Sequence, residues 1–240
     1  MNRKTIIIIG ATSGIGKALF ENYAKDGNRL GIVGRRTNLL DELRCQHPSN
    51  THTAAADITK QDEIEQAVQS LYKELGSIDL AIVCSGTGEI NSSLDYDMER
   101  PTLDTNVTGW TFVVDTLYHI FEQQGHGHLV AITSVGGLRG EPMAPAYSAT
   151  KAYQINYMEA LRKKTFKAGG NIKVTDIRPG LVDTAMAKGE GLFWVMPVEK
   201  VARQICKAIR LKKSKVYVTK RWHLLAVINK NLPFKLYKRM

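Results

Sequence analysis

The chain has 240 residues, of which 43% are hydrophobic, and a formal net charge of +10. This length suits one large α/β core, a single domain over 1–240, and no apolar run approaches the roughly 18 residues of a membrane span. The three cysteines, Cys45, Cys84 and Cys206, form no CxxC pair, so no disulfide framework is implied. The four isoleucines at 6–9 are too few for a signal peptide, and we expect an intracellular, cytoplasmic protein.

Strand-like and helix-like segments alternate along the chain. Strands are expected at 5–9, 29–33, 52 to about 57, 78–86, 128–134, 172–180 and 215–219, and helices at 15–26, 37–46, 61–75, 102–124, 147–168 and 198–211. This alternation predicts βαβ units and a doubly wound, Rossmann-type α/β fold. About seven parallel strands would be covered by helices on both faces, in three αβα layers. Ligands should bind beyond the carboxyl ends of the strands.

The first predicted strand ends in GATSGIG, residues 10–16, and a helix follows at once. Glycines let a backbone turn tightly and approach a phosphate, and a helix N-terminus offers unpaired N–H groups and a partial positive charge. The spacing is GxxxGxG, which differs from the GxGxxG fingerprint of many dinucleotide sites. We expect a pyrophosphate site; the alternative is a glycine-rich turn that only packs a helix on the sheet.

The second predicted strand ends in Arg35 and Arg36. An acidic residue near this point holds the ribose 2′-hydroxyl in NAD-binding folds, and a carboxylate there would repel a 2′-phosphate. An arginine can instead bind that phosphate with two hydrogen bonds, and Ser13 can add a hydroxyl. The sequence therefore favours NADP(H), with the alternative that one of the two arginines points to solvent.

Tyr147 and Lys151 lie four apart in YSATK, at the start of a predicted helix, and therefore on one face. Hydride transfer to a carbonyl leaves an alkoxide that must be protonated, and free tyrosine, with a pKa of about 10, is an inefficient base near neutrality. A neighbouring ammonium favours the phenolate and lowers that pKa. Ser134, which ends a predicted strand, can donate to the developing oxyanion. The ordinary alternatives are an exposed helical pair and a turn residue.

Taken in order, GATSGIG, NVTG from Asn106, Ser134, YSATK and RPGLVDT at 178–184 resemble the short-chain dehydrogenase/reductase family in its single-domain form, over about residues 5–220. The resemblance implies that Tyr147 is the general acid/base and that Ser134 orients the substrate oxygen. It also implies that Lys151 lowers the tyrosine pKa and binds the nicotinamide ribose. Asn106 would hold a water that extends a proton relay from Lys151.

The resemblance also implies how the chain holds a dinucleotide. Asp57 and Ile58 would flank the adenine, Ser85 and Gly86 would pass the adenosine ribose, and residues 179–184 would pack against the nicotinamide. The expected cofactor contacts are Gly10, Thr12, Ser13, Gly14, Ile15, Gly16, Arg35, Arg36, Asp57, Ile58, Ser85, Gly86, Tyr147, Lys151, Pro179, Gly180, Val182 and Thr184. Two departures from the family pattern are Ile9, where Thr is usual, and Val83-Cys84-Ser85-Gly86, where Asn-Asn-Ala-Gly is usual. We expect them to alter the bracing of the sheet and not the chemistry.

Two segments lie outside the predicted core. Loop 183–197 is the expected substrate lid, which favours a hydrophobic alcohol or ketone unless its apolar cluster only packs on the core. The cluster comprises Leu192, Phe193, Trp194, Val195 and Met196. The tail 220–240 is basic and amphipathic, and it is expected to lie on an anionic membrane surface or to form a dimer contact. No nucleic-acid recognition motif accompanies the charge, so no nucleic-acid partner is expected.

The leading function is NADP(H)-dependent interconversion of a secondary alcohol and a ketone or aldehyde, with a small-molecule substrate. One alternative is a non-catalytic dinucleotide-binding redox sensor, which would be expected to lack Tyr147 or Lys151; another is a sugar-nucleotide epimerase or dehydratase, whose chains are longer. GHGH at 125–128 supplies two histidines without a third ligand, so no metal site is expected. The resemblance further implies a homodimer or homotetramer packed through the predicted helices 102–124 and 147–168.

Overall fold

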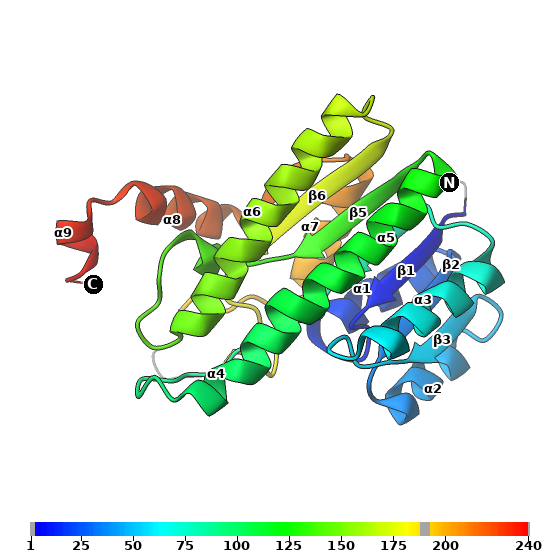
Figure 1. The fold of residues 1–240 in the computed structure, drawn as a ribbon, viewed down its shortest axis with the longest axis horizontal. Helices are drawn as coiled ribbons and strands as arrows, with labels where there is room; N and C mark the ends of the chain where they lie inside the picture. The colour runs from blue at the N-terminus through cyan, green and yellow to red at the C-terminus, as the bar shows by residue number, and fades with distance from the viewer. Residues whose placement is uncertain (1–2, 188–192, 240) are drawn as a thin grey trace.

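The computed structural model describes residues 3–187 and 193–239, and its strands form one parallel sheet in the order β3-β2-β1-β4-β5-β6-β7 (Figure 1). The strands are β1 (Thr5–Ile9), β2 (Arg29–Gly34), β3 (Thr51–Ala55), β4 (Leu80–Val83), β5 (Gly127–Ile132), β6 (Ile172–Pro179) and β7 (Lys215–Val218). The predicted Rossmann-type sheet is confirmed. The chain runs outward from β1 to β3 and then crosses back, so that β4 lies on the other side of β1. In sheets of this kind, ligands bind beyond the carboxyl ends of the two strands at such a crossing, which are β1 and β4 here.

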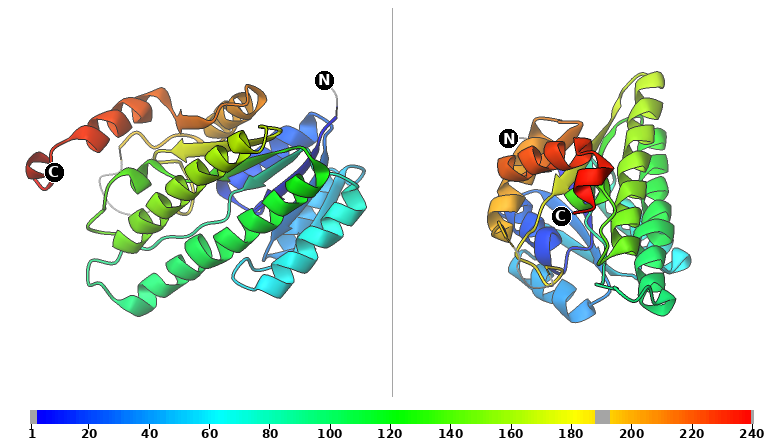
Figure 2. Two further views of the ribbon diagram at one scale, coloured as in Figure 1. Left: turned by 45° about the horizontal axis from the view of Figure 1, so that its top comes forward. Right: turned by 90° about the vertical axis from the view of Figure 1, so that its left-hand side faces the viewer.

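Helices cover both faces of the sheet, with α3, α5 and α6 on one face and α1, α2 and α7 on the other (Figures 1 and 2). The helices are α1 (Gly14–Lys25), α2 (Thr37–Gln46), α3 (Gln61–Leu75), α4 (Tyr96–Leu103), α5 (Trp110–Gln124), α6 (Pro145–Lys167), α7 (Val198–Arg210), α8 (Lys220–Asn231) and α9 (Phe234–Tyr237). A π-helical turn, η1 (Asp104–Gly109), joins α4 to α5, and a 3₁₀ turn, η2 (Val135–Leu138), follows β5. The predicted three-layer arrangement is therefore confirmed.

The central strand β1 shows why this sheet is buried on both faces. Successive side chains of a strand point to opposite faces, so Ile7 and Ile9 pack with α3, α5 and α6, whereas Ile6 and Ile8 pack with α1, α2 and α7. All four isoleucines are fully buried. Full burial of such a side chain contributes roughly 1.5–3 kcal/mol, so this strand helps to hold a helical layer on each face of the sheet.

The helix predicted over 102–124 begins earlier and is not a uniform α-helix. Asp95 caps α4 by accepting a 2.9 Å hydrogen bond from the backbone N–H of Asp97, and Pro101 lies inside the helix. The helix continues through Pro101, although proline disfavours a helical conformation in the residue before it. The extra residue per turn of η1 changes the direction of Asn106, and such π-helical turns often occur at functional sites.

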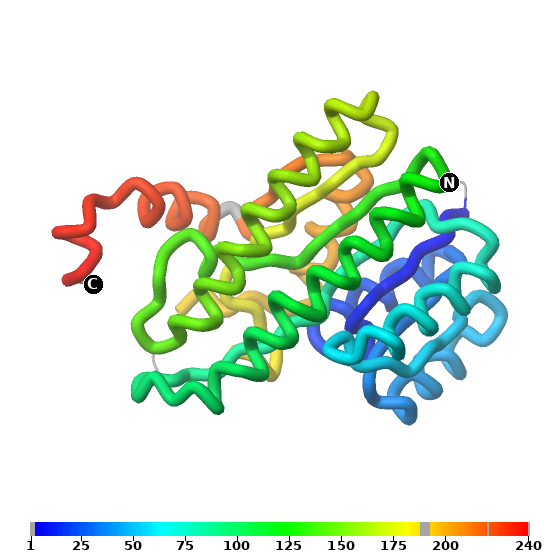
Figure 3. Tube along the Cα trace, in the orientation of Figure 1, coloured from blue at the N-terminus to red at the C-terminus, as the bar shows by residue number. Residues whose placement is uncertain are grey.

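The C-terminal tail forms α8 and α9, which extend from one end of the body in red in Figures 1 and 3. Arg139, just after η2, donates hydrogen bonds to the carbonyl oxygens of Asn229 and Leu232 at the end of α8. Tyr237 of α9 donates to the carbonyl oxygen of Gly140. The tail is thus attached to the loop that follows β5. Among the described residues, no helix is long and apolar enough to cross a membrane.

Candidate active site

The glycine loop lies where β1 ends and α1 begins. Gly10 and Gly14 adopt φ values of +87° and +51°, which favour glycine. Ser13 precedes α1 without forming a side-chain cap, and the first turn of α1 contains no acidic residue. Its N–H groups and the positive end of the helix dipole therefore suit an anionic group. The expected contacts Ile15 and Gly16 lie in this first turn.

The two arginines after β2 take different positions. Arg36 donates from Nη2 to the hydroxyl oxygens of Thr12, at 2.8 Å, and Ser13, at 2.9 Å, so its guanidinium lies directly over the glycine loop. Arg35 is 73% exposed, and its Nη1 lies 3.4 Å from the carboxylate of Asp57. Both arginines therefore lie at the carboxyl end of β2, but Arg36 is the one beside the predicted phosphate site.

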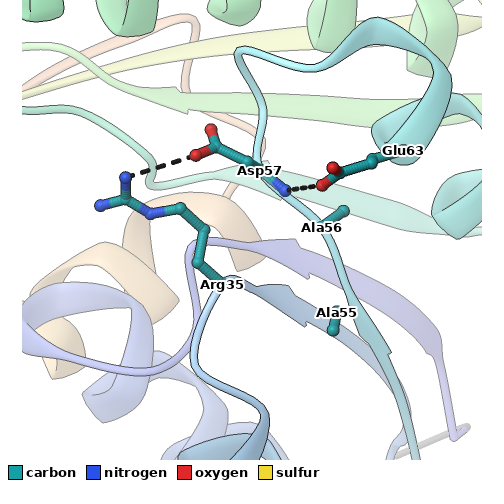
Figure 4. Close-up of a pocket in the computed structure, with 5 residues that line it drawn as sticks. All are labelled: Arg35, Ala55, Ala56, Asp57 and Glu63. Carbon is teal, nitrogen blue, oxygen red and sulfur yellow. Dashed lines mark hydrogen bonds and ion pairs between the residues drawn. The ribbon is translucent and has the colours of Figure 1, made fainter.

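Asp57 lines a shallow pocket of about 210 Å³ beside β3, where the adenine is expected (Figure 4). The pocket is lined by Arg35, Ala55, Ala56, Asp57 and Glu63. Burial raises the pKa of the Asp57 carboxyl, but two 2.9 Å hydrogen bonds from Thr59 and the charge of Arg35 outweigh burial, so this pKa lies below its ordinary value. Asp57 is therefore an ionised carboxylate paired with Arg35 at neutral pH.

Tyr147 and Ser134 meet beyond the carboxyl end of β5. Tyr147 lies in the first turn of α6, and Ser134 follows β5, where its Oγ accepts a 3.0 Å hydrogen bond from the N–H of Gly136. Burial raises the pKa of the Tyr147 hydroxyl above its ordinary value, and a side-chain hydrogen bond with Ser134 lowers it by less. The Nζ of Lys151 lies 5.8 Å from the centre of the Tyr147 ring. These residues by themselves do not produce the lowered tyrosine pKa that the sequence predicted, because burial dominates.

Lys151 is 3% exposed and lies beneath Tyr147. Burial lowers the pKa of its ammonium to about 8, against the opposing charge of Asp176. Its Nζ donates to Oε1 of Gln154, at 2.9 Å, and lies 3.5 Å from the carbonyl oxygen of Ile132. The lysine is therefore held in place by polar partners and changes its charge close to neutral pH.

Asn106 is fully buried and ties three segments together. Its side chain accepts a 2.9 Å hydrogen bond from the N–H of Thr87 and donates to the Thr87 carbonyl oxygen, at 2.7 Å, and to Oγ1 of Thr150, at 3.1 Å. Its carbonyl oxygen accepts a 2.9 Å bond from Nε2 of Gln154. The amide of Gln154 thus bridges Asn106 and Lys151, in the region where the resemblance implies a water.

Gln154 is a site residue that the sequence prediction missed. It is fully buried, and it lies one turn beyond Lys151 on the same face of α6. The available signal was a glutamine at i+3 from a lysine on the inner face of the helix. Glutamines on helices are ordinarily exposed to solvent, so the sequence offered no reason to place this one in the site.

Gly88 is a second missed residue. A Cβ on Gly88 would overlap the ring of Tyr147, whereas a Cβ on Gly136, on the other side, would lie 3.4 Å from that ring. The tyrosine ring is therefore held between two backbone segments, one after β4 and one after β5. A side chain at position 88 would displace it.

The remaining predicted cofactor contacts gather at the same edge of the sheet. Measured from the position that a Cβ would take on each glycine, Oγ of Ser85 lies 2.7 Å from Gly10, a methyl carbon of Thr184 3.2 Å from Gly14, and Nζ of Lys151 3.2 Å from Gly86. The carbonyl oxygen of Ile58 abuts Gly109 of η1, Pro179 ends β6, and Val182 pairs with Met196. Segments far apart in the sequence therefore converge on one edge of the sheet.

The predicted lid lies partly outside the described residues, including Leu192. Phe193 and Trp194 are 55% and 43% exposed, and the ring of Phe193 stacks on Trp222 of α8 at 5.6 Å between ring centres. A Cβ on Gly180 would overlap the Trp222 indole, which also donates to the carbonyl oxygen of Trp194 at 3.3 Å. The tail therefore covers one side of Gly180 and contacts the end of the lid. The sequence showed no signal for this contact.

The other candidate groups have structural partners. His126 is exposed and lies 3.2 Å from the carbonyl oxygen of Gln124, whereas His128 is buried and lies 2.7 Å from the hydroxyl of Thr175. In the part of the chain that the structure describes, no three His, Cys, Asp or Glu side chains form a group suited to a metal ion. Burial raises the pKa of the Cys84 thiol to about 12, so this cysteine remains a thiol at neutral pH.

Comparisons with known proteins agree with this arrangement. The family model described as short chain dehydrogenase matches residues 4–192. Uncharacterized oxidoreductases of Staphylococcus haemolyticus and Myxococcus xanthus are each 32% identical to this chain over 191 residues; both matches cover 78% of this chain, and 82% and 75% of the relatives.

Solved structures show the same fold at lower identity. A short chain dehydrogenase from Burkholderia cenocepacia in complex with NADP superimposes with a TM-score of 0.86 at 19% identity, covering 99% of this chain and 97% of that one. A short chain dehydrogenase/reductase from Burkholderia phymatum in complex with NAD has a TM-score of 0.85 at 18% identity, with 95% and 92% covered. The family match, the 32% identical relatives and the converging glycine loop, serine, tyrosine and lysine lead to one conclusion: this chain belongs to the short-chain dehydrogenase/reductase family and is an oxidoreductase.

Proposed function

We propose that this protein is an NADP(H)-dependent oxidoreductase that interconverts a secondary alcohol and a ketone or aldehyde, with Tyr147 as the acid/base. The observation that carries the proposal is the convergence of Tyr147, Ser134 and Lys151 at the edge of the sheet that also holds the glycine loop. The Tyr147 ring lies 3.4 Å from the Cβ position of Gly136, whose N–H bonds Ser134, and its centre lies 5.8 Å from Nζ of Lys151. A Tyr/Lys pair on a surface helix would not bury its lysine to 3% exposure.

Ser134, Tyr147 and Lys151 would each have a separate role during carbonyl reduction. A bound NADPH would supply the hydride. Ser134 donates a hydrogen bond to the carbonyl oxygen, and Tyr147 gives its proton to the alkoxide that forms. Because burial keeps the pKa of Tyr147 above its ordinary value, the tyrosine carries its proton at neutral pH, as an acid requires. Lys151, with a pKa of about 8, can return a proton to the phenolate.

The preference for NADP(H) rests on Arg36. Its guanidinium already bonds the hydroxyls of Thr12 and Ser13 at the start of α1, so a phosphate placed there would meet a fixed cation and two hydroxyl groups. The glycine loop fits a dinucleotide independently, because α1 begins with uncapped N–H groups and no acidic residue in its first turn.

The substrate class and the assembly follow from exposed apolar surface. Phe193 and Trp194 leave aromatic area at the end of the lid, which favours a hydrophobic carbonyl compound. On α6, Tyr153 and Phe166 are 36% and 83% exposed. A homodimer or homotetramer packed through α5 and α6 would cover them.

The catalytic assignment is tested with Tyr147→Phe, assayed with NADPH and a panel of apolar ketones. Because general acid catalysis contributes roughly 10²–10⁴-fold, we expect kcat to fall at least about 100-fold. Tyr153→Phe, an exposed tyrosine on the same helix, is the matched control and should retain wild-type turnover. Turnover of Tyr147→Phe within about threefold of wild type would refute the assignment, and tight NADPH binding without turnover of any substrate would favour the redox sensor.

The cofactor preference is tested with Arg36→Met, which keeps the aliphatic stem and removes the charge. Losing a charged hydrogen bond costs about 1.5–3 kcal/mol, so we expect the KM for NADPH to rise roughly 10- to 100-fold while that for NADH changes little. Arg35→Met, next in the chain but paired with Asp57, should have the smaller effect. Equal losses for NADPH and NADH would count against a bound 2′-phosphate.

A further inference from the structure

The helix α8 carries apolar side chains on two opposite faces. Trp222 and Ala226, one turn apart, are buried against the body of the protein. Leu224, Val227 and Ile228 form a second stripe, with exposed fractions of 64%, 46% and 51%. A helix that is apolar on both faces requires two apolar neighbours, and the described domain supplies one of them.

Two more exposed apolar side chains lie on α9. Phe234 and Leu236 are 69% and 52% exposed, which places five large apolar side chains on the outside of a short tail. We call these five residues, Leu224, Val227, Ile228, Phe234 and Leu236, the apolar stripe. Large exposed apolar side chains gathered in this number on one short segment indicate an interaction site.

The charge of the tail indicates what covers the apolar stripe. Residues 220–240 contain six Lys or Arg and no Asp or Glu, and the last acidic residue of the chain is Glu199. If a second copy of the tail packed on the stripe, the two sets of cations would repel one another with no acidic side chain of either tail between them. An anionic bilayer surface instead satisfies both features, because its interface accepts apolar side chains and its headgroups attract cations.

We propose that the tail 220–239 binds the surface of an anionic lipid bilayer, with the apolar stripe inserted between headgroups and the flanking lysines and arginines on lipid phosphates. The tail lies on the surface and does not span, because no described helix is long and apolar enough to cross a membrane. The binding does not depend on the proposed reaction.

The docked position of the tail connects this surface to the site. Arg139 holds the end of α8, Trp222 covers Gly180, and the ring of Phe193 stacks on Trp222. A bilayer that binds the apolar stripe therefore lies on the far side of α8 from the described end of the lid, about one helix diameter, roughly 10 Å, away. If the proposed reaction holds, this placement favours a carbonyl compound dissolved in the bilayer.

Binding is measured by co-sedimentation of the full-length protein with vesicles of phosphatidylcholine, with and without phosphatidylglycerol. We expect at least tenfold tighter binding to the anionic vesicles, and a loss of binding at high salt because the screening length shortens. The triple variant Leu224→Gln, Val227→Gln, Ile228→Gln should bind at least tenfold more weakly. Replacing Lys235, Lys238 and Arg239 by Gln should abolish the preference for anionic vesicles.

Two controls separate a bilayer from other occupants. Leu211→Gln removes an apolar side chain of similar exposure, 55%, just after α7, and its binding should equal that of wild type. NADPH affinity of every variant reports whether the domain is folded. Equal sedimentation of wild type and the triple variant would overturn the proposal. So would a wild-type oligomer, measured without lipid, that dissociates in the triple variant, because a second copy would then cover the stripe.

Discussion

Gln154 lies between the two residues on which the proposed proton relay depends. Its amide accepts a hydrogen bond from the Lys151 ammonium and donates one to the Asn106 carbonyl oxygen, each at 2.9 Å, in a fully buried position. A hydrogen bond to a buried ammonium favours its charged form, because it replaces part of the lost hydration. Gln154 therefore acts as a positioning residue, and it limits how far burial lowers the pKa of Lys151.

Gln154→Leu removes both hydrogen bonds and keeps the approximate volume of the side chain. We expect kcat to fall at least about tenfold, because a hydrogen bond to a charged group contributes about 1.5–3 kcal/mol. The pKa of Lys151 should drop below its value of about 8, so the alkaline limb of the pH–rate profile should move to lower pH. The measurement is kcat against pH with saturating NADPH.

Asn156→Leu, at an exposed position on the same helix, is the control for that experiment. It should leave both the rate and the profile unchanged. If Gln154→Leu lowers the rate while the alkaline limb stays in place, Gln154 only supports the packing of α6, and the positioning role is wrong.

At the scale of elements, the strongly periodic segments were predicted closely. The strand at 5–9 and the helices at 37–46 and 61–75 are confirmed at both ends, because a run of β-branched residues and a regular apolar face each fit only one kind of structure. The long helix from Tyr96 was predicted too short, because Pro101 signals a boundary in sequence. In the fold, packing of α4 tolerates the proline.

The contact between the tail and the site belongs to the same scale. The sequence identified the tail as basic and amphipathic, but its period did not show which face docks. Apolar residues occur on both faces of α8, so the sequence pattern does not show which face packs on the domain. The face with Trp222 packs there, because the missing side chain of Gly180 leaves room for the Trp222 ring.

At the scale of the whole molecule, the sheet buries charged and polar groups, and one of them, His128, couples folding to pH. Asp176 and Arg178 form a salt bridge at 2.7 Å, with side chains 0% and 4% exposed, and Thr133 donates to Asp176 at 2.6 Å. His128 is buried at the start of β5, and its pKa is lowered to about 4 by burial and then by Lys4, Lys212 and Lys173. The Thr175 hydroxyl donates to the Lys213 carbonyl oxygen and so accepts from Nε2–H of His128.

His128 predicts a loss of stability in acid. Its pKa is below the ordinary 6.5 in the folded state, so the unfolded chain binds more protons between pH 6.5 and about 4, and the free energy of unfolding falls as the pH falls through that range. The shift corresponds to about 3 kcal/mol at the acid end. Urea unfolding at pH 7, 5 and 4 measures this loss.

His128→Gln keeps an N–H donor for Thr175 and does not titrate, so its stability should depend less on pH across the same range. His126→Gln, at an exposed histidine two residues earlier, should keep the wild-type dependence. If the free energy of unfolding depends on pH in the same way in wild type and His128→Gln, His128 is not the group that causes the loss of stability in acid.

The sequence by itself determined the alternation of strands and helices, the family and the residues that we propose carry the chemistry, because glycine spacing, hydrophobic period and a Tyr/Lys pair are local features. Only the tertiary structure decided which of the two arginines faces the glycine loop, how Gln154 joins Lys151 to Asn106, and that Trp222 covers Gly180. These contacts join residues from different elements, so they depend on packing and burial. Burial is also why Tyr147 has a raised pKa where its neighbour in sequence predicted a lowered one.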